Sequence, residues 1–101
     1  MTLSYIRHSK TKGYLKIGVK DGDAKYEFTV SEKDFHAVGA PTLGDSITRE
    51  AFDTISYCDT EYRAKLKALR ILSFGDNSER MLKRKLTMSG FSRDVAEKTV
   101  S

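Results

Sequence analysis

The sequence predicts an α+β fold, in which a small antiparallel β-sheet of about three strands is followed by a bundle of three helices. Residues 2–31 alternate between apolar and polar side chains, whereas residues 48–100 repeat apolar side chains at helical spacing. The chain of 101 residues is long enough for one small domain, or for two small modules that share a core. This length excludes a large catalytic barrel and a doubly wound nucleotide-binding fold.

The strands of the sheet are expected in the first third of the chain. Residues 3–8 form a first strand, and residues 14–20 and 26–30 alternate strictly, with their apolar side chains on one face. Asp21-Gly22-Asp23 lies between the last two segments and is typical of a tight turn, because glycine accepts a positive φ. The pattern therefore predicts a hairpin within a three-stranded sheet that packs one face against helices.

Helices are predicted where a capping residue or a polar stretch precedes apolar side chains at helical spacing. They cover residues 31–38, 48–57, 61–74, 78–89 and 92–101, and the expected N-caps are Ser31, Thr48, Ser78 and Ser92. The segments 48–57 and 61–74 are predicted as separate helices. The last helix is expected to be truncated, because the chain stops at Ser101 without a C-terminal cap.

The helix predicted over residues 61–74 has an unusually wide apolar face, which spans about 220° when residues are placed about 100° apart. Its members are Tyr62, Ala64, Leu66, Ala68, Leu69, Ile71 and Leu72. A helix so widely apolar is expected to be covered on two sides, by the sheet and by the helices that follow. It would then be the centre of a single core.

The net charge of +4 arises entirely in the second half of the chain. Eight basic and eight acidic residues precede Tyr57, whereas ten basic and six acidic residues follow from Tyr57 onward. Six of the cations form two stripes on neighbouring predicted helices, namely Arg63, Lys67 and Arg70, and Arg80, Lys83 and Arg84. Two interpretations stay open: the stripes are solvated faces of amphipathic helices, or they bind phosphates or an acidic protein surface.

No catalytic, metal-binding or cofactor-binding arrangement is predicted. His8 and His36 lack a cluster of Cys or carboxylate residues at ligand spacing, and Cys58 has no histidine near it in the sequence. One cysteine also excludes an internal disulfide framework and fits a reducing compartment. Because no apolar run approaches the roughly 20 residues of a membrane span and no signal peptide is recognised, a soluble cytoplasmic protein is expected.

Several segments of the helical half resemble the first three-helix repeat of the RecX regulatory proteins. The resemblance is carried by Ala64–Ser73, by Ser78 with Leu82–Leu86, and by Gly90-Phe91-Ser92 with Val95. The hairpin, Val30-Ser31-Glu32 and residues 44–55 are similar to an additional module that many RecX proteins carry before that repeat.

The resemblance implies a regulatory protein that binds the RecA filament on single-stranded DNA. Such a protein restrains recombination and co-protease activity in DNA repair and the SOS response, without an enzymatic reaction or cofactor of its own. It implies an amino-terminal β-rich module over residues 1–57 and a three-helix repeat bundle of right-handed type over residues 58–101. Family members carry two further repeats, so the chain is expected to be a fragment.

Two departures from the family pattern concern the start of the helix at Ser78. The preceding loop, Phe74-Gly75-Asp76-Asn77, is not basic as in the family, and Met81 stands where a glutamate would close a capping box. We therefore expect Ser78 alone to cap this helix.

Two alternative functions stay open beside the RecX interpretation. One is a non-catalytic protein interaction module whose basic helix faces are merely solvated. The other is a small DNA-binding domain, since two helices joined through Gly75 have the outline of a helix-turn-helix. A dimer formed through the truncated last helix, by exposed Val95 and Val100, is a further expectation.

Overall fold

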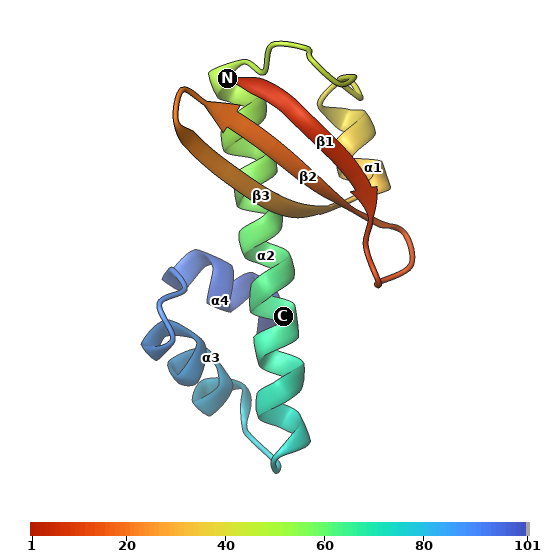
Figure 1. The fold of residues 1–101 in the computed structure, drawn as a ribbon. Coiled ribbons are helices and arrows are strands. Elements are labelled where there is room, and N and C mark those ends of the chain that lie inside the picture. The colour runs from red at the N-terminus through yellow and green to blue at the C-terminus, as the bar shows by residue number, and fades with distance from the viewer. Residues whose placement is uncertain (101) are drawn as a thin grey trace. The chain divides into compact units, whose positions relative to one another are not determined.

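The computed structural model describes residues 1–100 and confirms the predicted α+β fold: a three-stranded antiparallel sheet followed by helices (Figure 1). The strands are Thr2–His8 (β1), Tyr14–Asp21 (β2) and Ala24–Ser31 (β3), and the helices are Glu32–Ala37 (α1), Arg49–Ser73 (α2), Glu79–Met88 (α3) and Arg93–Val100 (α4). The chain forms two compact units, Met1–Asp59 (unit 1) and the part from Thr60 onward (unit 2). Each unit is described by itself.

Unit 1 is built on the sheet, whose strands follow the order β1-β2-β3. The register places Ile17 on β2 opposite Ile6 on β1 and Phe28 on β3, which brings the apolar side chains of all three strands to one face. The buried core cluster on that face consists of Leu3, Leu15, Ile17, Val19, Phe28, Val30, Phe35, Ile47 and Ile55. Figure 1 shows α1 and the first part of α2 on this side of the sheet.

Other segments of unit 1 form hydrogen bonds with part of each edge of the sheet. The segment before α2 runs along β1, where Leu3 N–H donates to Asp45 O at 3.0 Å and Ile47 N–H donates to Met1 O at 2.8 Å. At the opposite edge, the Thr29 N–H of β3 donates to the carboxylate of Asp59 at 2.8 Å, and Asp59 is buried. Exposed strand edges pair readily with other chains, and these contacts occupy the edge of β1 at Met1–Leu3 and one N–H of β3.

The prediction of two helices over residues 48–57 and 61–74 is wrong, since α2 is one continuous helix of 25 residues. Thr48 caps its start by accepting the Ala51 N–H at 3.1 Å, as predicted. No glycine or proline lies between residues 57 and 61 to interrupt the backbone. Instead, Asp59 points its carboxylate to the sheet edge while the helix continues through it.

Unit 2 has its own smaller core, so the expectation of a single core around residues 61–74 is also wrong. The buried cluster consists of Ala68 on α2, Leu82 and Leu86 on α3, and Ala96 on α4, with Ile71, Phe91 and Val100 packed partly buried against it. Of the wide apolar face predicted for α2, Leu66, Leu69 and Leu72 are 48%, 65% and 44% exposed. The two-sided cover expected for this face is therefore not observed over residues 1–100.

The remaining predicted N-caps are confirmed. Ser31, Ser78 and Ser92 each accept the backbone N–H three residues on, at 3.0, 3.2 and 3.3 Å. After α3, Gly90 adopts a φ of +102° and donates its N–H to Thr87 O at 3.1 Å, which suits a residue without a side chain.

Two expectations about burial in α3 and α4 need correction. Helical spacing predicts that Met81, Leu82, Leu86 and Met88 share the apolar face of α3. Only Leu82 and Leu86 are buried there, whereas Met81 and Met88 are 50% and 78% exposed. Val95 on α4 is buried, so it does not provide the exposed contact expected for a dimer.

Candidate functional site

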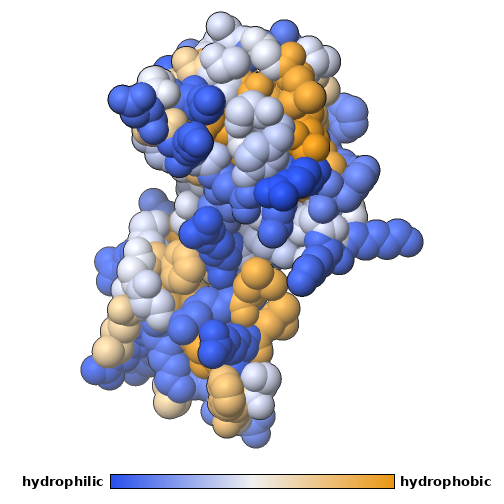
Figure 2. All heavy atoms as spheres, viewed as in Figure 1, coloured by the Kyte–Doolittle hydropathy of each residue, from blue (hydrophilic) through white to orange (hydrophobic). Residues whose placement is uncertain are grey.

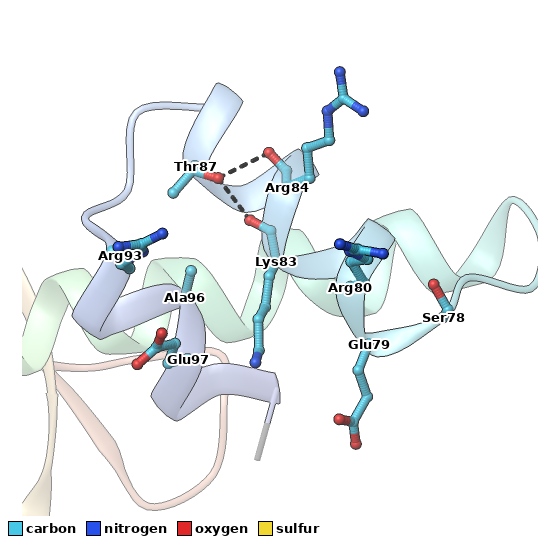
Figure 3. A pocket seen from close by; sticks show the side chains of 9 residues that line it. All are labelled: Ser78, Glu79, Arg80, Lys83, Arg84, Thr87, Arg93, Ala96 and Glu97. Carbon is cyan, nitrogen blue, oxygen red and sulfur yellow. Dashed lines mark hydrogen bonds between the residues drawn. The ribbon is translucent and has the colours of Figure 1, made fainter.

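The predicted basic stripe of Arg80, Lys83 and Arg84 lines a hollow of about 710 Å³ in unit 2 (Figure 3). Arg80, Lys83 and Arg84 project from α3, and Arg93 is added from the first turn of α4. Hydroxyl groups and two carboxylates complete the lining, which consists of Ser78, Glu79, Arg80, Lys83, Arg84, Thr87, Arg93, Ala96 and Glu97. Four cations against two carboxylates give this hollow a positive balance.

The start of α3 and its helical spacing bring the cations of this hollow together. Ser78 caps the helix by accepting the Met81 N–H, and the spacing of Arg80, Lys83 and Arg84 places them on one face. Thr87 donates its hydroxyl to the backbone oxygens of Lys83 and Arg84, at 2.8 and 3.0 Å, so its polar atom is used within the helix. Figure 3 shows the Lys83 side chain running beside α4, whereas the Arg84 guanidinium points away from it.

The other predicted stripe lines a second hollow of unit 2, of about 340 Å³. Arg63, Lys67 and Arg70 lie on α2, one turn apart, and share the hollow with Leu66, Ser89 and Phe91. None of these six lining residues is acidic. The hollow therefore combines three cations with apolar surface from a leucine and a phenylalanine.

Two acidic residues near the basic stripes, Glu79 and Glu61, interact with a helix end and with a lysine of α4. Glu79 lies in the first turn of α3, where a carboxylate interacts favourably with the helix dipole. Glu61 forms an ion pair with Lys98, with 4.0 Å between Oε2 and Nζ, which links α2 to α4. Glu97 also lines the larger hollow, so its four cations face two carboxylates, whereas the lining of the smaller hollow holds three cations and no carboxylate.

The site residues were predicted on separate helices, and the structure shows how they are grouped. Arg93 and Phe91 were not predicted as site residues, because they belong to a different turn and helix from the stripes they join. A sequence signal did exist for Arg93, since Ser92 was predicted to cap a helix directly beside it.

Unit 2 also exposes apolar side chains around its basic residues. Leu66, Leu69 and Leu72 follow the exposed side of α2, and Phe74 directly after it is 82% exposed. Figure 2 shows hydrophobic surface interrupted by hydrophilic side chains over the helices of this unit. Such a mixture is typical of surfaces that contact other proteins.

Over residues 1–100, no three His, Cys, Asp or Glu side chains are grouped closely enough to hold a metal ion. In the same range, no helix has both the length and the apolar character needed to cross a bilayer. Cys58 is a free, partly buried thiol that packs against the core of unit 1.

Comparison with known proteins agrees with the predicted resemblance to RecX. The family described as "RecX, first three-helix domain" matches residues 64–101. A solved structure described as "Crystal structure of regulatory protein RecX" has the same fold, with a TM-score of 0.64 and 23% sequence identity. No curated protein matches the chain.

The two matches differ in how much of the chain they cover. The structural match includes 98% of this chain, and so extends through the sheet as well as the helices, whereas the family match is confined to the helical half. This chain spans about half, 47%, of the length of the solved RecX chain.

Proposed function

From the RecX-type three-helix domain in residues 64–101, we propose that the chain is a regulator that binds the RecA filament on single-stranded DNA. Bound there, it restrains the recombinase and co-protease activities of the filament in the cytoplasm. The proposed action is binding alone and includes no enzymatic step and no cofactor. The proposed contact residues are Arg63, Lys67, Arg70, Arg80, Lys83 and Arg84, joined by Arg93.

The observation that supports this proposal is the grouping of seven cations in two hollows of unit 2. A filament of protein on single-stranded DNA offers phosphates and acidic side chains, both of which attract Arg and Lys. Each phosphate neutralised on a single strand contributes about −0.7 to the slope of log K against log salt. Three to six such contacts would therefore lower the affinity steeply as salt rises.

The first experiment measures binding to RecA filaments on labelled oligo(dT) at 50 and 200 mM salt. A fourfold rise in salt is expected to lower the affinity by roughly 20-fold for three phosphate contacts and by several hundred-fold for six. Equal affinity at both salt concentrations would overturn the electrostatic part of the proposal.

A triple substitution tests the residues themselves. Arg63→Glu, Lys67→Glu and Arg70→Glu reverse the charge of the second hollow, and filament binding is expected to be lost while the melting temperature stays unchanged. The matched control reverses three exposed cations of unit 1, Lys10→Glu, Lys12→Glu and Lys33→Glu, and should leave binding intact. Unchanged binding by the triple variant would contradict the proposal.

The exposed apolar side chains of unit 2 favour a second candidate function, a protein interaction module that contacts its partner through α2. Leu69 is 65% exposed and lies among Leu66 and Leu72 on the same helix. In this case Leu69→Ser would lower partner binding at every salt concentration, because apolar contacts are insensitive to screening. If Leu69→Ser abolishes binding and the charge reversal does not, the second candidate is preferred.

A further inference from the structure

The outer face of the sheet in unit 1 carries cations in an electrostatically unfavourable arrangement. In the register of the sheet, Lys20 on β2 lies directly opposite Lys25 on β3, and Arg7 on β1 lies directly opposite Lys16 on β2. Like charges in directly opposed positions destabilise a sheet. The structure thus contains two such pairs on the face that does not pack against the core.

The acidic residue on this face does not neutralise both pairs. Glu27 lies opposite Gly18, between the Arg7–Lys16 pair and the Lys20–Lys25 pair. Its carboxylate binds Arg7, with 3.0 Å between Oε2 and Nη2. The hydrogen bond from Tyr5 is the main cause that holds the pKa of Glu27 below its usual value, and the charges of Lys16 and Arg7 lower this pKa further. Within residues 1–100, neither Lys20 nor Lys25 forms an ion pair.

Lys20 and Lys25 share a hollow of about 370 Å³ with Ser4, Tyr5, Tyr26 and Glu27. Two ammonium groups and a serine hydroxyl offer hydrogen-bond donors to an anionic group, whereas the Tyr5 hydroxyl already donates to the Glu27 carboxylate. In Figure 1 the helices of unit 1 lie behind the sheet, and the same view in Figure 2 shows hydrophilic side chains at the left and lower edges of this unit, with pale and hydrophobic surface between them and on the right. This face is therefore open to a partner.

Arg7 and Tyr5 stack on each other beside these cations. The Tyr5 ring lies over Gly18, where any Cβ would collide with it, and its hydroxyl donates a hydrogen bond to Glu27. The Arg7 guanidinium lies 4.6 Å above the centre of the Tyr5 ring, and the Arg7 side chain is 63% exposed. Guanidinium groups held in this way are surfaces on which unpaired bases stack.

We propose that the outer face of this sheet binds single-stranded nucleic acid, with Lys16, Lys20 and Lys25 on its phosphates and the Arg7–Tyr5 pair beneath a base. Anionic phosphates would relieve the repulsion within both opposed pairs. A single strand is favoured over a duplex because a broad sheet face does not enter a groove, whereas splayed bases reach a flat platform. Lys16 and Lys20 lie four residues apart, about 13 Å along β2, so one strand can contact both rows.

This proposal does not depend on RecA binding, and it concerns residues outside the matched three-helix domain. The experiment therefore uses the whole chain and a fluorescein-labelled 15-nucleotide oligo(dT) without RecA. Binding is followed by fluorescence anisotropy between 50 and 200 mM salt. The helix variant Arg80→Gln/Lys83→Gln/Arg84→Gln is measured in parallel, so that contacts of unit 2 are separated from those of the sheet.

The test variant is Lys20→Gln/Lys25→Gln. Loss of two phosphate contacts is expected to reduce the slope of log K against log salt by about 1.4. Between 50 and 200 mM salt, the affinity of this variant should therefore fall by a factor about sevenfold smaller than that of the unsubstituted chain. The melting temperature should equal or exceed that of the unsubstituted chain, because a repulsive pair is removed. The control Lys33→Gln/Arg49→Gln removes two exposed cations from α1 and α2 and should keep the full slope.

Three results would overturn the proposal. The first is an unchanged slope and affinity in Lys20→Gln/Lys25→Gln, with the helix variant losing all binding. The second is a duplex of equal length binding as tightly as the single strand. The third is competition by polyglutamate of equal charge as effective as that by unlabelled oligo(dT), which would assign the face to acidic proteins.

Discussion

The two units of the chain bury their apolar side chains to different extents. The core cluster of unit 1 contains nine buried residues, most of them large or β-branched, and further side chains close around it. The core cluster of unit 2 contains four, of which two are alanines. Six of the nine large apolar residues that are exposed, Leu66, Leu69, Leu72, Phe74, Met81 and Met88, lie in unit 2.

Unit 1 buries a larger apolar core, whereas unit 2 leaves more of its large apolar side chains exposed. Buried apolar area is the main source of stability, so unit 1 is expected to resist unfolding more strongly than unit 2. In unit 1, residues 44–47 bond to the start of the β1 edge, and Asp59 bonds to one N–H of the β3 edge. A less stable unit with exposed apolar and basic side chains suits a binding function, because regions that bind partners are often those of lower local stability.

The largest effects should come from truncating the two cores. Ile17 and Leu86 are both fully buried, and replacing either by alanine is expected to lower the free energy of unfolding by about 2–5 kcal/mol. Because the core of unit 2 is small, Leu86→Ala should remove hydrogen-exchange protection from α3 and α4 while the amides of β2 keep theirs. Equal loss of protection in β2 would show that the two units unfold as one.

A smaller effect is expected at the edge of β3. Asp59→Ala removes the acceptor of the Thr29 N–H and should cost about 1–3 kcal/mol, measured by chemical denaturation. Asp59→Asn keeps an oxygen acceptor of nearly the same shape and serves as the control, with a smaller loss. If the two substitutions destabilise equally, the carboxylate acts through its charge and the edge contact contributes little.

The smallest effect concerns acid and the segment that covers β1. The Asp45 carboxylate accepts the backbone N–H and the hydroxyl of Thr42, at 2.8 and 2.9 Å, and these bonds lower the pKa of Asp45. A depressed pKa in the folded state means that the stabilisation is present above the unfolded-state pKa and is lost as pH falls through the folded-state value.

Thr42→Val removes the hydroxyl donor and keeps the N–H, so the pKa of Asp45 should rise part of the way to its usual value. An NMR titration of the Asp45 carboxyl group measures this directly. A pKa that does not move would mean that the backbone N–H alone holds the carboxylate, and unit 1 would then depend less on this side chain than its geometry indicates.

Local features were predicted well because they depend on residues close in the chain. The alternation over residues 14–20 and 26–30 predicted β2 and β3, and the serines at 31, 78 and 92 cap helices as expected. The break expected near residue 60 was wrong, since the change from the sheet-facing part of α2 to the rest occurs without a change in helical backbone. Periodicity records which side chains share a face, and it does not record which neighbour covers each part of a helix.

The residues of the candidate sites also include some that the sequence predicted and some that only the tertiary structure brought in. The sequence alone placed three cations on one face of α2 and three on one face of α3, because helical spacing determines which residues are neighbours on a surface. The addition of Arg93 to one hollow and of Phe91 to the other depended on how the chain returns after α3.

By itself, the sequence determined the strands, the caps, the basic stripes and the resemblance to RecX, all of which arise from local spacing and residue type. Only the tertiary structure decided that Leu66, Leu69 and Leu72 stay exposed, that unit 2 has a core of its own, and that Lys20 lies opposite Lys25. Burial and strand register depend on contacts between residues far apart in the chain. Those contacts form only when the whole chain packs.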